Sequence, residues 1–324
     1  AFKMAQWLAP FFTYHFFTGD PGDSIVTAVV ASVGVFLLAT VIELLAAIAL
    51  KWLLLGRLKP GRYPLWGWTY FRWWLVDRFI EAAPSYLFNG SSLYTLWLRA
   101  LGAKIGREVL VGSMTLRAPD LLTVADEASL GNAVNFENAR VERGELVLGA
   151  ITIERNAYVG SYAVLEGNTK LGAWAHLEAH SALADGECLP EKRVWTGSPA
   201  RDIGAFDPAS LPGRRNAGPL RLNAEAAFFV VGALLVAILF FLPVFPTFML
   251  IDWLDEANRL PWLQGDSNWL QLGKYFLLSL PASAVLIVLT ALLSAGIRWG
   301  VLPKMRPGCT PVHGRLYLSK WLVN

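Results

Sequence analysis

Two histidines, His176 and His180, stand four residues apart in the segment WAHLEAHSA. Imidazole accepts and releases a proton near neutral pH, so histidine is a common base when an amine attacks a carbonyl carbon. Histidines also occur on protein surfaces without any such role. The chain therefore offers two candidate bases, and the alternative of two plain surface histidines stays open.

The two histidines belong to a run with a six-residue period. Each step holds an aliphatic residue, and most steps hold a small residue four positions later; the aliphatic residues are Ile153, Val159, Leu165, Leu171, Leu177 and Leu183. Three such hexapeptides make one triangular coil, whose aliphatic side chains point inward and stack on the next coil. Strands of an ordinary sheet would alternate every two residues instead. We therefore predict a left-handed parallel β-helix with a C-terminal cap over residues 105–205.

One coil of three hexapeptides has eighteen residues, so residues that far apart lie above one another. This places His176 above Tyr158 and His180 above Tyr162. None of the four occupies an inward aliphatic position of the period. We expect both histidines on outer faces of the β-helix.

The composition requires a bilayer as part of the solvent. Hydrophobic residues make up 55% of the chain and charged residues only 16%. Three windows, 24–50, 224–251 and 272–297, have the roughly 20 apolar residues that a membrane-spanning helix needs. Basic residues flank the windows on the side of residues 51–223, whereas the loop between the second and third windows is acidic. The positive-inside rule then predicts a multi-pass protein of the inner (cytoplasmic) membrane with the β-helix on the cytoplasmic side.

The remaining segments follow from this arrangement. We predict an outer loop after a missing span at 1–23, an amphipathic interfacial segment against membrane lipid at 51–104, a linker at 206–223, an outer loop at 252–271 and the start of a next tandem module at 298–324. The net charge of +3 is dispersed, so we expect no nucleic-acid partner. Cys188 and Cys309 lack metal-ligand spacing, so we expect no metal.

The tandem module is predicted from an internal repeat. Residues 51–77 align without a gap to residues 298–324, and the two copies share Trp, Leu, Val, Pro, Gly and Tyr residues at ten positions. Both copies directly follow an apolar window. We expect the chain to be an excerpt that begins in one module and ends in the next; a complete protein with a ragged start is the alternative.

The end of the repeat run carries a family resemblance. Residues 193–203, RVWTGSPARDI, resemble the G-x-P-A-[KR]-x-I ending of hexapeptide-repeat acyltransferases. In that family the segment lies along the pantetheine arm of the donor thioester, which implies donor contacts for Gly197, Ser198, Pro199, Ala200 and Arg201. The chain as a whole, including PLWGWTYFRWWLV, resembles the C-terminal membrane region of ε-poly-L-lysine synthetase-like, single-module nonribosomal peptide synthetases.

This second resemblance implies an amide-forming function. The donor would be an aminoacyl thioester on phosphopantetheine, carried by a domain that follows an upstream adenylation domain. Sister β-helix modules, or further copies of the chain, would assemble into a trimer. Two alternatives stay open: a non-catalytic membrane scaffold that docks the carrier domain, and a free-standing acetyltransferase that uses coenzyme A.

The chain departs from sugar acetyltransferases of this fold, because the stretch that carries their catalytic histidine has none here. Polar residues occupy that region instead and are our candidates for the acceptor site: Asn135, Glu137, Asn138, Glu166 and Asn168. The base is then His180 or His176, or a carboxylate, or this module is a non-catalytic copy.

Overall fold

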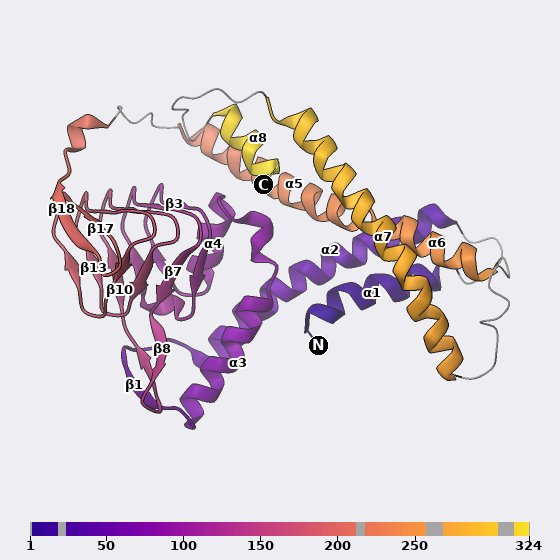
Figure 1. Cartoon of the computed structure of the whole chain (residues 1–324), viewed down its shortest axis with the longest axis horizontal. Coiled ribbons are helices and arrows are strands. Elements are labelled where there is room, and N and C mark those ends of the chain that lie inside the picture. The colour runs from indigo at the N-terminus through magenta and orange to yellow at the C-terminus, as the bar shows by residue number, and fades with distance from the viewer. Residues whose placement is uncertain (1, 19–23, 212–217, 257–267, 304–313, 324) are drawn as a thin grey trace. The chain divides into compact units, whose positions relative to one another are not determined.

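The structure is a computed structural model that describes residues 2–18, 24–211, 218–256, 268–303 and 314–323 (Figure 1). It has two compact units. The first contains residues 1–6 and 38–230, and the second contains residues 7–37 and 231–324. Each unit is described by itself.

Short parallel strands build most of the first unit. One sheet contains β2 (Lys104–Ile105), β5 (Leu122–Val124), β10 (Ile151–Ile153), β13 (Lys170–Leu171) and β16 (Cys188–Leu189). A second contains β3 (Leu110–Val111), β6 (Ser129–Leu130), β11 (Tyr158–Val159), β14 (His176–Leu177), β17 (Arg193–Thr196) and the antiparallel β18 (Arg201–Ala205). A third contains β4 (Met114–Leu116), β7 (Val134–Glu137), β12 (Val164–Glu166) and β15 (Ala182–Leu183). The chain visits the three sheets in turn, so it winds as a three-sided parallel β-helix, the arrangement that the six-residue period predicts.

The aliphatic positions of the period form the core of the β-helix. Ile153 pairs in register with Leu171, and Leu171 with Leu189, and all three side chains are buried. Fully burying such a side chain contributes about 1.5–3 kcal/mol. Each coil therefore gains its stability from the coils above and below it.

A hairpin interrupts the period between β7 and β10. Its strands β8 (Ala139–Glu142) and β9 (Glu145–Leu148) leave the β-helix, and β9 pairs antiparallel with β1 (Gly61–Pro64). This small sheet lies beside the coils and against α3 (Trp68–Ala82) (Figure 1). Trp73 of α3 shares a buried cluster with Leu146 and Leu148 of the hairpin.

The interfacial segment predicted over 51–104 is corrected. The structure divides it into a π-helical turn at Lys51–Leu55, β1, α3, a 3₁₀ turn at Ser85–Phe88 and α4 (Ser92–Ala100). Prolines and glycines at 56, 60, 61, 64, 67 and 84 prevent one continuous helix. α4 covers the first coil, because Trp97 and Leu98 are buried in the same core as Ile105. α3 keeps an exposed aromatic face with Trp68, Phe71 and Trp74, and Trp66 just before it is also exposed.

A buried ion pair joins the end of α2 (Ile25–Leu50) to the β-helix. The Lys51 ammonium lies 2.7 Å from the Asp120 carboxylate, and the two side chains are 0% and 6% exposed. The other Asp120 oxygen accepts the Leu58 amide at 3.2 Å. Asp120 belongs to the 3₁₀ turn Pro119–Leu121 that precedes β5.

Long helices make up the second unit. They are the part of α1 (Phe2–Phe16) from Trp7 onward, part of α2, the end of α5 (Pro219–Phe241), α6 (Val244–Glu256), α7 (Asn268–Val301) and α8 (Arg315–Val323). In the described part of the chain, three apolar helical stretches are long enough to cross a bilayer: Ile25–Leu55, Leu220–Leu254 and Gly273–Val301. The predicted window 224–251 falls within the second stretch, and the windows 24–50 and 272–297 each begin one residue before the first and third stretches. Pro243 separates α5 from α6, because proline lacks the amide hydrogen that would continue the helix.

Two predicted loops are corrected. Residues 1–23 contain the helix α1, whose aromatic residues recur at helical spacing: Trp7 contacts Phe36 and Phe241, and Tyr14 contacts Phe245. The loop predicted at 252–271 is helical at both ends, in α6 and α7. Its middle, 257–267, lies outside the described residues, as do 212–217 of the predicted linker and 304–313 of the predicted next module.

Candidate functional site

His180 lies at the corner between the second and third sheets. It follows β14 with a positive φ of 55°, and Tyr162 holds the same corner one coil earlier with a φ of 60°. The two rings stack in parallel, 5.0 Å between centroids and 4° between planes. Both side chains are exposed, which confirms the predicted placement. The backbone of this corner is fixed because the His180 amide donates to the Ser161 carbonyl at 3.0 Å.

The predicted donor turn lies against the residues that follow His180. The Gly197 amide donates to the Ser181 hydroxyl at 3.1 Å. The Ala182 amide donates to the Gly197 carbonyl at 2.9 Å, and the Ala200 amide donates to the Ala182 carbonyl at 2.8 Å. The turn thus continues the third sheet by one more rung, next to the imidazole corner.

Within this turn, Gly197, Ser198 and Pro199 are exposed, whereas Ala200 is buried. Arg201 is exposed and opens β18, which returns antiparallel to β17. Ser198 and Pro199 are joined by a cis peptide bond. Three consecutive residues and the Arg201 guanidinium are therefore accessible to a ligand that runs along this edge.

His176 occupies a different environment. It lies on the outer face of the second sheet, where its ring stacks on Phe206 at 3.7 Å and contacts Tyr158 at 5.3 Å. Phe206 follows β18 and its amide donates to the Lys192 carbonyl at 2.7 Å. Burial under these rings lowers the pKa of His176, although the Glu178 carboxylate opposes the shift. His176 is thus covered where His180 is open.

The outer face of the third sheet carries most of the predicted acceptor residues. Asn135 lies in register with Val164, and Glu137 with Glu166. The Asn135 amide donates to the Glu137 carboxylate at 3.0 Å. Since Val164 pairs in turn with Ala182, this face adjoins the corner that holds His180.

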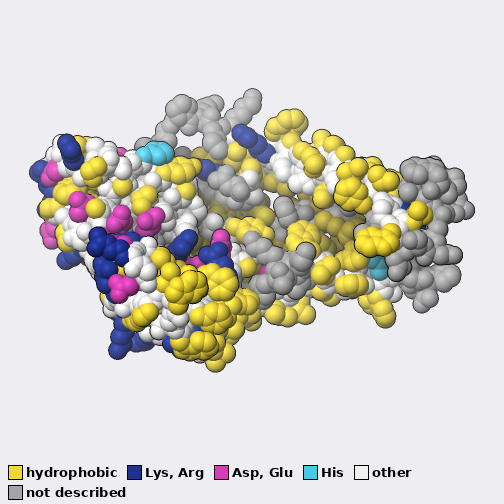
Figure 2. All heavy atoms as spheres, turned by 60° about the horizontal axis from the view of Figure 1, so that its bottom comes forward, with side chains coloured by type: hydrophobic (Ala, Val, Ile, Leu, Met, Phe, Trp, Pro, Cys, Tyr) yellow, Lys and Arg dark blue, Asp and Glu magenta, His cyan; other side chains and the backbone are white. Residues whose placement is uncertain are grey.

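Glu166 and Asn168 belong to a charged cluster at the opposite corner of the third sheet. Arg140 of the hairpin lies 2.6 Å from Asp185 and 3.4 Å from Glu166, and Asn168 donates to Asp185 at 2.9 Å. The hydrogen bond from Arg140 lowers the pKa of the Asp185 carboxyl. Figure 2 shows acidic and basic side chains side by side on this unit. The hairpin therefore supplies one wall of the polar face.

Asn138 is the exception among the predicted acceptor residues. Its side chain is fully buried, its amide donates to the Ala118 carbonyl at 2.7 Å and its carbonyl accepts the Ala118 amide at 3.1 Å. Both ends of the amide are used to hold the chain where the hairpin begins. Asn138 has a structural role and does not face a ligand.

Sequence reasoning missed three contributors to this region: Ser181, Arg140 and Asp185. Ser181 is one of the small residues that follow the aliphatic positions of the six-residue period, and that pattern gives no sign that its hydroxyl orients the donor turn. Arg140 lies on the hairpin, where no period relates it to the coils. Asp185 could have been found, since it comes one coil and one residue after Glu166.

The arrangement provides the parts that acyl transfer to an amine needs. An exposed imidazole can take a proton from the attacking nitrogen. Carboxylates on the adjoining face can hold an ammonium group. Among the described residues, no group of three or more His, Cys, Asp or Glu side chains is arranged to hold a metal ion.

The six-residue period and the three parallel sheets define the class of this protein, a hexapeptide-repeat protein with apolar helices attached. No family model matches the chain. Among solved structures, a hexapeptide-repeat acetyltransferase from Vibrio cholerae is 17% identical, with a TM-score of 0.32, over 52% of this chain and 93% of that one. A maltose O-acetyltransferase from Clostridium difficile is 15% identical, with a TM-score of 0.30, over 52% and 88%. The fold assignment rests on the strand pairing of the chain itself.

One curated relative matches nearly the whole chain. The chain is 46% identical over 325 positions to delta-poly-L-ornithine synthetase of Acinetobacter baumannii, and the match covers 99% of this chain. It covers 24% of the relative, so the chain spans about a quarter of the length of that synthetase. The likeness to poly-amino-acid synthetases that the resemblance to the ε-poly-L-lysine synthetases predicted is confirmed along nearly the whole chain.

Proposed function

We propose that this chain is a membrane-anchored acyl-transfer module that forms amide bonds in a poly-amino-acid synthetase. The observation that carries the proposal is the 46% identity, along nearly the whole chain, to one quarter of a poly-L-ornithine synthetase. The open imidazole of His180 beside the donor turn supports it. The β-helix would wind left-handed, and the apolar helices would hold it at the cytoplasmic side of the inner membrane.

The proposed donor is an aminoacyl thioester on the phosphopantetheine of a carrier domain. Its arm would run along Gly197–Pro199 and Arg201, the exposed part of the turn. The acceptor amine would lie over the outer face of the third sheet, where Glu137 and Glu166 favour a cationic amino acid. Its nitrogen attacks the thioester carbonyl carbon, the C–N bond forms and the C–S bond breaks. His180 removes the proton from nitrogen, and the thiolate leaves on the carrier.

The surroundings of the two histidines support different roles for them. His176 is stacked under Phe206, and its lowered pKa follows from that burial. His180 is exposed beside the turn that we assign to the donor. We therefore assign the base to His180 and a packing role to His176.

The test uses the chain in detergent or nanodiscs with ornithinyl or lysyl thioesters of N-acetylcysteamine as donors and the free amino acids as acceptors. Amide products are counted by mass spectrometry after the uncatalysed reaction is subtracted. His180→Ala is expected to lower the rate by about 10²–10⁴-fold, the usual contribution of a general base. His176→Leu is the matched control and is expected to keep the rate within a few fold.

The alternatives give different results. If coenzyme A thioesters serve as donors and carrier-type thioesters do not, the chain is a free-standing acetyltransferase. If the chain binds a loaded carrier domain and forms no amide, it is a scaffold. Equal losses for the two histidine variants would refute the assignment of the base.

A further inference from the structure

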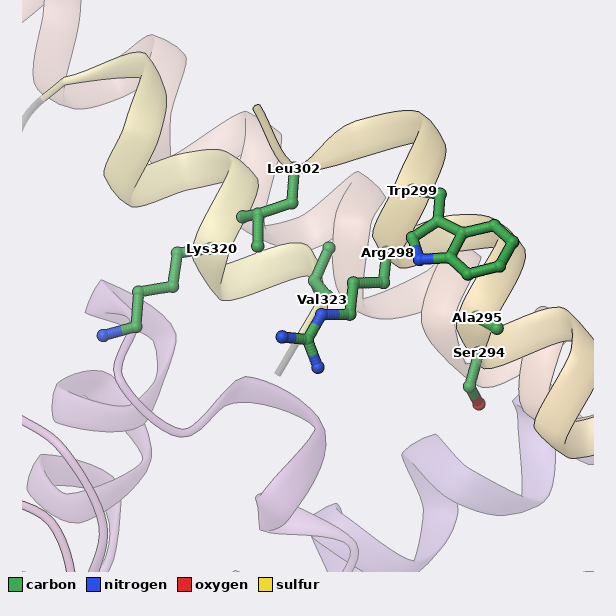
Figure 3. A pocket seen from close by; sticks show the side chains of 7 residues that line it. All are labelled: Ser294, Ala295, Arg298, Trp299, Leu302, Lys320 and Val323. Carbon is green, nitrogen blue, oxygen red and sulfur yellow. The ribbon is translucent and has the colours of Figure 1, made fainter. Parts of the chain in front are cut away.

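A pocket of about 610 Å³ lies between the end of α7 and α8 in the second unit. Arg298 of α7 and Lys320 of α8 line it, together with the apolar side chains of Leu302 and Val323 (Figure 3). Within the described part of the chain, its lining includes no acidic residue. The pocket therefore offers two cations beside an apolar wall.

The internal repeat relates this pocket to residues of the first unit. Arg298 aligns with Lys51, Leu302 with Leu55, Lys320 with Trp73 and Val323 with Val76. The helices correspond as well, because α8 begins at Arg315, which aligns with Trp68, the first residue of α3. The same two-helix corner is thus present twice in the chain.

In the first unit, this corner seats a turn of the β-helix. Lys51 pairs with Asp120 at 2.7 Å, and the Trp73 indole donates to the Arg117 carbonyl at 3.1 Å. Leu55 packs against the cluster that contains Trp73, Ala118 and Leu121. We call the set Lys51, Leu55, Trp73 and Val76 the Lys51 socket. Its occupant is the turn at residues 117–121.

The two cationic residues at the corresponding positions of the second unit are exposed, whereas Leu302 and Val323 are half-buried. Lys51, Trp73 and Val76 are buried, whereas Arg298 and Lys320 are exposed. The chemistry is nevertheless matched: Arg298 keeps the cation of Lys51, and the Lys320 ammonium can donate a hydrogen bond as the Trp73 indole does.

The opposite side of α8 is already packed. A Cβ added at Gly232 of α5 would lie 2.7 Å from the Trp321 ring, so this helix approaches α5 closely. α8 is therefore held from one side while its pocket face stays open. An open face on a fixed helix can receive a rigid partner without rearrangement.

We propose that the pocket is a second socket whose occupant is another β-helix domain of this kind. The occupant would insert the turn that corresponds to residues 117–121, with its carboxylate on Arg298 and a backbone carbonyl on Lys320. The choice of occupant rests on the aligned positions and on the match between a carboxylate and two cations. The proposal does not use the catalytic activity, so it stands or fails separately from the proposed function.

The first test keeps the full chain and extends it. Residues 77–211 are repeated directly after Val323, so that a second β-helix follows α8 in the register in which the first follows α3. Hydrogen exchange of α8 and of the end of α7 is compared with the unextended chain. We expect amides of Arg315–Val323 to exchange at least tenfold more slowly in the extended chain.

Variants that swap the two charges test whether the proposed ion pair causes this protection. Asp120→Lys in the added β-helix alone should abolish the protection, and Arg298→Glu in the same chain should restore it. Absence of protection while both β-helices are folded would overturn the proposal. The two β-helices have the same sequence, so their peptides have the same mass. Both copies are folded if these peptides give one protected mass envelope, whereas an unfolded copy would add a second, fast-exchanging envelope.

A second measurement needs no added domain. In the unextended chain in phosphatidylcholine nanodiscs, amides of Arg315–Val323 should exchange at least tenfold faster than those of residues 68–76, whose socket is filled. Equal protection would mean that the second socket is already covered and would refute the proposal. Protection that arises only when phosphatidylglycerol is added would assign the pocket to a lipid headgroup instead, which would also refute it.

Discussion

Removal of the Asp120 carboxylate tests how α2 is joined to the β-helix. Asp120→Ala leaves the Lys51 ammonium with no exposed surface and without its partner at 2.7 Å. Breaking one partner of a buried ion pair costs about 3–5 kcal/mol. Lys51 also lies 3.4 Å from the centroid of the Trp52 ring, and this contact is the same before and after the substitution.

The expected cost of about 3–5 kcal/mol corresponds to a local opening that is about 150-fold to 5 × 10³-fold more frequent. Hydrogen exchange should report it at the Leu58 amide, which donates to Asp120 at 3.2 Å. The first strands of the β-helix, β2 and β5, should exchange faster together with it, whereas the last coils should not change.

Two further variants decide whether charge burial is the cause. The double variant with Lys51→Met and Asp120→Asn removes both charges and keeps an acceptor for the Leu58 amide. The free energy of local opening at Leu58 should then return to within about 1 kcal/mol of the unmodified chain. Lys170→Met breaks a pair of the same 2.7 Å length whose lysine is half exposed, and should leave exchange unchanged. The reasoning is refuted if Asp120→Ala changes exchange less than threefold, or if the double variant is as damaged as Asp120→Ala.

Two other predictions concern the β-helix itself. Burial lowers the pKa of His176 from its ordinary value of 6.5. The neutral ring therefore stabilises the packing of Phe206 fully above pH 6.5, and this stabilisation is lost as the pH falls through the folded-state pKa. Hydrogen exchange of residues 201–206, compared at pH 7.5 and pH 5, should show the loss, and His176→Leu should remove the pH dependence. Gly149→Ala would place a Cβ 2.6 Å from the Gly167 backbone and should destabilise the domain by about 1–3 kcal/mol in thermal unfolding; an unchanged unfolding temperature would show that the hairpin can move away.

The sequence predicts the β-helix well because each coil repeats the same contacts. Ile153, Leu171 and Leu189 are buried by residues of the same type eighteen positions away, so the period and the core are one signal. The same reasoning correctly stacked His180 on Tyr162. The period could not predict the hairpin at 139–148, because its partner β1 lies in a segment that the sequence predicts to be interfacial.

Contacts between segments of different kinds explain the other differences. Phe206 covers His176 only because β18 pairs antiparallel with β17. The six-residue period does not predict this antiparallel strand. The sequence predicts Lys51 to be a basic residue that flanks a membrane-spanning helix. In the structure it is buried against Asp120, 69 residues later. Helix α1 was missed because its aromatic residues resemble an interfacial loop, whereas they pack on Phe36 and Phe245.

The position of the proposed donor turn along the β-helix has a consequence for how substrates reach it. Asp120 ties the beginning of the β-helix to the end of α2, whereas Gly197 follows the last coil. Asp120 directly precedes β5, and three steps of about 4.8 Å separate β5 from β16 at the far edge of the first sheet, about 14 Å along the β-helix. If α2 spans the membrane as proposed, the turn stands about that far from the helix end, within the aqueous phase. A carrier domain could then approach the turn without contacting lipid.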